Sequence, residues 1–168
     1  IHHLFCENLS VLKDYKIVLC VDDSSSMNEP IIDTPIQNIQ NPTRYDEIKT
    51  IIRMLIDIAL IYDNDGLDMY FLNKNPVFDI KNYLYIEHIL NKTPEGHTPL
   101  RHITRQIFQK YKFNSKPVLL IVATDGIPTD NNGNEDLINF ISCLKKRNVD
   151  NYYVSFLACS NRKEDIYY

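Results

Sequence analysis

The fold is decided by one stretch near the start of the chain, Ile17-Val18-Leu19-Cys20-Val21-Asp22-Asp23-Ser24-Ser25-Ser26-Met27. Its apolar part, Ile17 to Val21, is β-prone without alternation, which is typical of a strand buried on both faces of a parallel sheet. The chain then turns polar, with carboxylates and hydroxyls following at once. Because ligands bind beyond the carboxyl ends of strands in open α/β sheets, this cluster of oxygen atoms indicates a cation or phosphate site. An ordinary turn built from Asp and Ser residues is the alternative.

Composition narrows the class of protein. The chain has 168 residues, 44% hydrophobic residues and only 4 glycines, so we expect a single globular domain spanning residues 1–168. The net charge is −4 and the pI is about 5.7. No basic cluster occurs in the sequence beyond Lys145-Lys146-Arg147. A nucleic-acid binder normally carries a clustered basic face, so no nucleic-acid partner is expected.

Targeting signals and cysteines indicate the compartment. No apolar run reaches the ~18 residues of a membrane span, and residues 1–15 lack the apolar core of a signal peptide. The cysteines are far apart, and Cys20 and Cys159 fall in strand-like runs, where a free thiol acts as a small buried hydrophobe. We therefore expect an intracellular protein without a membrane span. Glycosylation sequons at Asn8 and Asn91 leave an extracellular location open.

The rest of the chain alternates helices and strands. Helices are expected over about 4–15, 43–62, 83–90, 99–111 and 135–147, and strands over 17–21, 67–72, 77–80, 117–123 and 152–159. This alternation predicts an α/β fold with a doubly wound, mostly parallel sheet and helices on both faces. The connection into 77–80 is too tight for a parallel crossover, so this short strand should be antiparallel and lie at the edge.

Local signals mark the helix starts and one long loop. Thr43 is a candidate N-cap for the helix that follows it, and Thr98 is a candidate N-cap with Pro99 at the first helical position. The segment 28–42 is rich in proline and asparagine and is long for a strand-to-helix connection. Since it leaves the same sheet edge as the Asp22 cluster, we expect it to contribute to function.

Oxygen donors occur in three segments expected at the carboxyl edge of the sheet. These are Asp22-Asp23-Ser24-Ser25-Ser26, Gly96-His97-Thr98 and Thr124-Asp125-Gly126, in this order. On these motifs, residues 15–160 resemble a von Willebrand factor type A (vWA) domain with a complete metal-ion-dependent adhesion site (MIDAS). The resemblance implies the Rossmann-like vWA fold, with the loop 28–42 beside the metal site.

The resemblance also implies a ligand set, composed of Asp22, Ser24, Ser26, Thr98 and Asp125. Ser24 and Ser26 would bind the metal directly, and Thr98 directly or through water. The two aspartates would act mostly through water or by holding the serines. Hard oxygen donors without imidazole or thiolate select Mg²⁺, with Mn²⁺ or Ca²⁺ possible, over zinc. The open coordination position would take an Asp or Glu of a protein partner.

The sequence also departs from the family pattern. Ser25 stands where many members have glycine, and His97 replaces the second glycine of the threonine loop. Neither change removes an oxygen donor. We interpret His97 as a loop side chain rather than a ligand, and Asp23 as a solvated side chain.

These features predict a divalent-metal-dependent protein–protein interaction module rather than an enzyme. A haloacid-dehalogenase-like phosphotransferase is one alternative, but its chemistry needs a second Asp two residues after the first, where this chain has Ser24. The chain also lacks a glycine-rich phosphate loop. The other alternative is a structural vWA-like domain with a vestigial site, because every site residue could serve as a cap or turn.

Overall fold

A computed structural model of the chain describes residues 9–31, 36, 39–62 and 66–160. In this part of the chain five strands form one sheet, in the order β3-β2-β1-β4-β5. Their bounds are β1 Lys16–Val21, β2 Leu67–Phe71, β3 Val77–Ile80, β4 Val118–Thr124 and β5 Tyr152–Ala158. Strand β3 is antiparallel to β2, and the other neighbours are parallel. The predicted mostly parallel sheet with an antiparallel edge strand is therefore confirmed.

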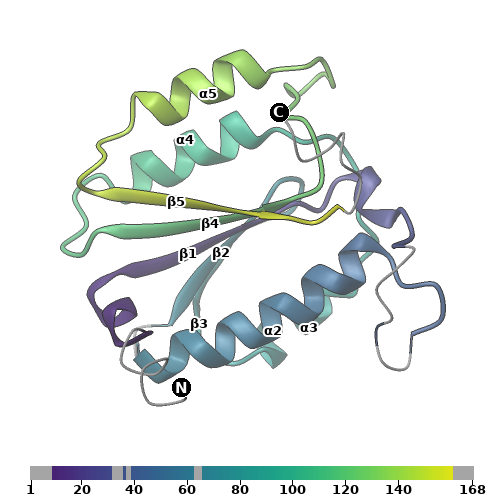
Figure 1. Cartoon of the computed structure of the whole chain (residues 1–168), viewed down its shortest axis with the longest axis horizontal. Coiled ribbons are helices and arrows are strands. Elements are labelled where there is room, and N and C mark those ends of the chain that lie inside the picture. The colour runs from purple at the N-terminus through teal and green to yellow at the C-terminus, as the bar shows by residue number, and fades with distance from the viewer. Residues whose placement is uncertain (1–8, 32–35, 37–38, 63–65, 161–168) are drawn as a thin grey trace.

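Helices cover both faces of the sheet. The α-helices are α2 Arg44–Tyr62, α3 Leu84–Leu90, α4 Leu100–Lys110 and α5 Leu137–Lys145, and the 3₁₀ helices are η1 Ser10–Asp14 and η2 Ser25–Asn28. Helices α2 and α3 lie on one face, and α4 and α5 lie on the other (Figure 1). This arrangement confirms the doubly wound, Rossmann-like α/β class.

The core is split into two layers by the central strand β1. Ile17 and Leu19 pack with α2 and α3 on one face, while Val18 and Cys20 pack with α4 and α5 on the other. All four side chains are buried. An apolar run without alternation is what such a strand requires, because each of its faces meets a helical layer.

The sheet reverses its strand order between β1 and β4. From β1 the chain builds β2 and then β3 on one side, and it returns with β4 and then β5 on the other. The two central strands stay in register to their ends, where the Asp22 N–H donates to the Ala123 carbonyl at 2.9 Å. Asp22 and Asp125 therefore leave the sheet at the point where α/β proteins usually bind ligands.

The two predicted N-caps have different outcomes. Thr43 is confirmed, since its Oγ1 accepts from the Asp46 N–H at 3.2 Å while Asp46 accepts from the Thr43 N–H at 3.0 Å. The prediction that Thr98 is an N-cap is wrong, because α4 begins at Leu100 and no side chain caps its first turn. The backbone of Thr98 instead pairs with Thr129, in both directions at 2.9 Å.

Other element boundaries differ modestly from expectation. Of the helix expected over 4–15, the described part is the 3₁₀ helix η1, and residues 1–8 lie outside the described residues. Residues 32–35 and 37–38 of the loop 28–42 also lie outside them. The base of this loop is closed by the Ile31 N–H donating to the Pro42 carbonyl at 2.9 Å.

No helix within the described ranges is both long and apolar enough to cross a membrane.

Candidate metal centre

Asp22 joins the carboxyl ends of the two central strands. Its Oδ1 accepts from the Ser24 N–H at 2.9 Å, and its Oδ2 accepts from the Thr124 hydroxyl at 2.6 Å. The side chain is fully buried. The first bond turns the chain sharply after β1, and the second ties that turn to the end of β4.

A chain of oxygen atoms continues from this turn. The Ser24 and Ser26 hydroxyls lie 3.1 Å apart, and Ser26 donates to Asp125 Oδ1 at 2.9 Å. The short helix η2 brings Ser26 back towards β4, and it is anchored by the buried side chain of Met27. Four of the five predicted metal residues are thereby linked into one cluster.

The threonine loop lies against the serine turn. The Ser25 N–H donates to the Gly96 carbonyl and the Gly96 N–H donates to Ser25 Oγ, both at 3.1 Å. Gly96 has a φ of +91° and packs against the side chain of Asn73, so a larger residue there would be strained. Ser25 therefore has a structural use that a glycine at this position would lack.

Thr98 lies at the end of this loop and is buried. Within the described residues, no hydrogen bond links its hydroxyl to the cluster of Asp22, Ser24, Ser26 and Asp125. Since no side chain caps α4, the Thr98 hydroxyl is not needed by that helix. The structure thus places the fifth predicted residue in the adjoining loop, with its hydroxyl uncommitted to a cap.

Arg44 is a site residue that the sequence analysis missed. It begins α2, and its guanidinium contacts Asp125 Oδ2 at 2.5 Å and Glu29 Oε2 at 3.3 Å. The side chain is buried. No local pattern points to this contact, because residues 44 and 125 meet only through the tertiary fold. Arg44 supplies a positive charge to one of the two cluster carboxylates.

Asp23 corrects a second expectation. It is fully buried rather than solvated, with Lys74 Nζ 3.0 Å from its Oδ2 and the Asn73 N–H donating to its Oδ1 at 2.8 Å. Buried carboxylates need such partners, and these come from the segment after β2, which the sequence does not connect to Asp23. His97 is exposed and its carbonyl accepts from Asn73 Nδ2, as fits a loop side chain.

The charge on Asp22 is less well balanced than those of its neighbours. Burial raises the pKa of Asp22 to about 6, and the nearby Asp125 adds to the rise, while hydrogen bonds from Ser24 and Thr124 oppose it. Asp125 has Arg44 and Asp23 has Lys74 as ion-pair partners. Among the described residues, no Lys, Arg or His forms an ion pair with Asp22. A bound cation would relieve this imbalance.

The spacing of the oxygen atoms fits a small divalent cation. An octahedral Mg²⁺ site has ligands at about 2.1 Å, so adjacent ligand oxygens lie roughly 3 Å apart. The distance between the Ser24 and Ser26 hydroxyls is 3.1 Å, and that from Ser26 Oγ to Asp125 Oδ1 is 2.9 Å. In the described part of the chain no group of three or more His, Cys, Asp and Glu residues could hold a metal ion. Hydroxyls would therefore have to complete any ligand set here.

No family model matches the chain, and no curated protein matches its sequence.

Proposed function

We propose that this chain is a divalent-metal-dependent protein-binding module of the vWA type, in which a MIDAS takes an Asp or Glu of a protein partner. One observation carries this role: the Ser24, Ser26 and Asp125 oxygens lie at the spacing of adjacent ligands of one small cation. They do so at the switch point of the sheet, where this class of fold binds ligands.

The ligand chemistry suits an ion that must bind a further carboxylate. Ser24 and Ser26 are neutral donors, and the charge of Asp125 is shared with Arg44. An ion held mainly by neutral oxygens keeps positive charge, and it would offer that charge to a partner carboxylate. The donors are hard oxygens, so Mg²⁺ is the expected ion, with Mn²⁺ or Ca²⁺ as substitutes.

A pull-down from a cell lysate in Mg²⁺, repeated with chelator, tests this role. We expect a partner that is retained only with the metal and is lost when Ser26 is changed to Ala. Ser115→Ala is the matched control, since Ser115 is exposed and distant in sequence from the site. A partner retained equally in chelator, or by the Ser26→Ala variant, would contradict the proposal.

A structural domain with a vestigial site is the second candidate, and the ion pair between Arg44 and Asp125 favours it. That contact places a cation of the chain itself beside the cluster, at 2.5 Å from Asp125 Oδ2. If Arg44 has replaced the metal, the wild-type protein should bind no divalent cation at millimolar concentrations. Removing the arginine charge should then be needed before any cation binds.

A further inference from the structure

A groove runs between α4 and α5 on the face of the sheet opposite α2. Its volume is about 570 Å³, and it is lined by side chains of both helices and by Tyr152 at the start of β5. Phe108 lies in the groove and packs on Tyr152, with ring centroids 4.6 Å apart. The groove thus combines an aromatic patch with the polar residues described next.

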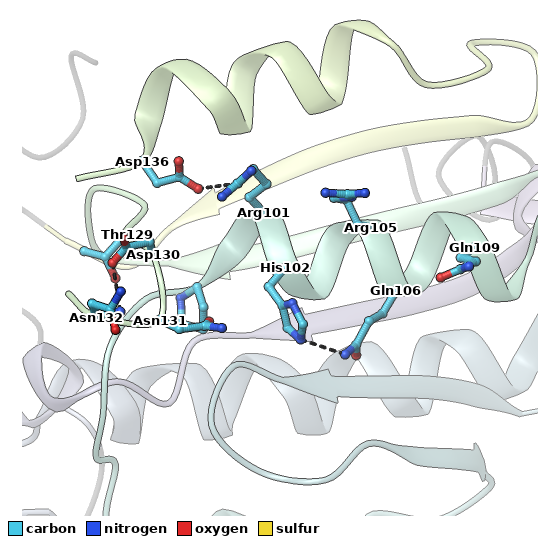
Figure 2. A pocket seen from close by; sticks show the side chains of 11 residues that line it. Arg101, His102, Arg105, Gln106, Gln109, Thr129, Asp130, Asn131, Asn132 and Asp136 are labelled. Carbon is cyan, nitrogen blue, oxygen red and sulfur yellow. Dashed lines mark hydrogen bonds and ion pairs between the residues drawn. The ribbon is translucent and has the colours of Figure 1, made fainter. Parts of the chain in front are cut away.

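Cations from two segments converge on this groove. Arg101 and Arg105 lie one turn apart on α4, and Lys112 comes just after this helix ends. Lys146 and Arg147 come just after the end of α5. Figure 2 shows Arg101 and Arg105 projecting from the side of α4 that faces α5. The sequence shows only the second group as a cluster, because the first is spread along a helix.

Two of these cations are held by oxygen atoms of the chain, and the other three are not paired with a carboxylate in the described residues. Arg101 binds Asp136 at 2.5 Å, and Arg147 donates to the Leu144 carbonyl at 2.8 Å. Arg105, Lys112 and Lys146 are exposed, and in the described ranges no carboxylate pairs with them. Of these three, Lys112 has its Nζ 5.1 Å from the centroid of the exposed Phe113 ring.

The charged residues that line the groove are all positive, although the protein as a whole is acidic. None of its lining residues is an Asp or Glu, although the whole chain has a net charge of −4. Burial raises the pKa of the Cys143 thiol, which lines the groove, while Arg105, Arg101 and Lys146 act to lower it. These cations are therefore close enough to act on a common point.

A second hollow lies between the groove and the edge of the sheet that carries the candidate metal centre. Thr129 lines it and is hydrogen-bonded to the backbone of Thr98. The volume of this hollow is about 490 Å³, and it shares Arg101 and Arg105 with the groove. Asp130 and Asp136 also line it, so this hollow has mixed charge, unlike the groove. An acidic ligand is therefore expected to stay in the groove rather than extend to the edge of the sheet.

We propose that the groove between α4 and α5 binds an acidic segment of a partner protein, with carboxylates facing Arg105, Lys112 and Lys146 and apolar groups on Phe108. The groove places cations around Phe108, an arrangement that suits a single peptide chain carrying both carboxylates and apolar groups. The negative charge of the rest of the molecule repels a dense polyanion more than a short segment with a few carboxylates. This binding goes beyond the proposed metal-dependent contact and does not require the metal.

The test is a fluorescence anisotropy titration with a short labelled peptide of alternating glutamate and serine residues, in low salt with chelator present. We expect saturable binding that weakens roughly tenfold or more in the Arg105→Glu/Lys146→Glu variant, since two attractive contacts become repulsive. The control is Lys13→Glu/Lys81→Glu, which changes net charge equally at exposed positions outside the groove and should bind like wild type.

An equal loss of peptide affinity in the groove variant and in the Lys13→Glu/Lys81→Glu control would show that binding depends only on net charge. That result would overturn the proposal. Tighter binding of a labelled oligothymidylate of similar length, lost in the groove variant, would overturn it in favour of nucleic acid. If the double reversal unfolds the protein, Arg105→Gln/Lys146→Gln gives the same comparison with a smaller loss. Because chelator is present throughout, failure of the metal centre leaves this result unchanged.

Discussion

Two buried carboxylates, Asp68 and Asp22, lie at opposite ends of the same sheet and differ in how their charge is balanced. Near the amino end of β2, Asp68 accepts from the Asp79 N–H at 2.8 Å, lies 3.2 Å from Lys16 Nζ and accepts from the Tyr111 hydroxyl. At the carboxyl end of β1, the Asp22 side chain accepts from neutral donors in the described part of the chain, the Ser24 N–H and the Thr124 hydroxyl.

This difference separates a structural cluster from a candidate binding site. Burying a carboxylate is costly unless a cation or several hydrogen bonds compensate it. Asp68 has its cation within the chain, so that cluster is complete. Asp22 has a raised pKa and sits beside hydroxyls at cation-ligand spacing. We therefore expect divalent metal to leave the stability of the Asp68 cluster unchanged and to raise that of the Asp22 cluster.

The largest effect is expected at the complete cluster. Asp68→Ala leaves Lys16 without its buried partner, so we expect a loss of roughly 3 kcal/mol in the free energy of unfolding. Urea denaturation should show the same loss in Mg²⁺ and in chelator. A loss that Mg²⁺ restores would mean that the two clusters are not independent.

In contrast to Asp68→Ala, the Asp22→Asn substitution should raise the free energy of unfolding relative to wild type. This gain should appear only when the pH rises above the acidic range. The folded pKa of Asp22, about 6, lies above the unfolded value of 3.8, so its protonation stabilises the fold at low pH and this contribution is lost as pH rises towards 6. The Asn variant does not titrate. In chelator its stability relative to wild type should therefore grow between pH 4 and 7, by up to about 3 kcal/mol.

The control for this pH series is Asp150→Asn, because Asp150 is exposed. Its stability relative to wild type should stay nearly constant over the same range. An Asp22→Asn curve parallel to wild type would show that the Asp22 charge is balanced in the fold, and the contrast with Asp68 would disappear.

Arg44→Gln tests whether the arginine opposes the metal. Removing its charge leaves Asp125 without its ion-pair partner, so we expect a loss of about 2 kcal/mol in chelator. The same change removes a cation that repels a divalent ion, so the stabilisation by Mg²⁺ should be larger than in wild type. Thermal melts with and without Mg²⁺ measure both effects. A smaller stabilisation by Mg²⁺ in Arg44→Gln than in wild type would show that Arg44 supports metal binding instead of opposing it.

The smallest effect on the fold is expected at Thr98. Because its hydroxyl caps no helix, Thr98→Ala should cost under about 1 kcal/mol in chelator, yet it should weaken the Mg²⁺ response. Thr98→Ser should preserve both. Thr50→Ala, at an exposed helix position, is the control. An unchanged Mg²⁺ response in Thr98→Ala would leave the site with four donors.

The sequence was sufficient for the fold and for the cluster at the sheet edge because both rest on local patterns. The unbroken apolar runs before Asp22 and Asp125 identify buried parallel strands, and the residues after such strands meet at one edge. The tight connection before β3 likewise identified the antiparallel pair.

What the sequence missed depends on contacts between distant segments. Arg44 and Lys74 reach Asp125 and Asp23 only through the packing of the fold, so neither Arg44 nor the burial of Asp23 was predicted. Thr98 has an N-cap residue type, but its pairing with Thr129 holds the backbone away from the helix. The cations that line the groove come from two separate segments, and they lie close together only because α5 packs beside α4 in the fold.

Calorimetric titration of the chelator-treated protein with Mg²⁺ tests whether the Asp22 cluster holds a divalent cation. We expect saturable binding at one site, weakened in Ser26→Ala. The melting temperature should rise with Mg²⁺, by an amount that corresponds to about 2.7 kcal/mol of stabilisation at a hundredfold excess over Kd. Absence of binding heat together with an unchanged melting temperature in Mg²⁺, Mn²⁺ and Ca²⁺ would contradict this expectation.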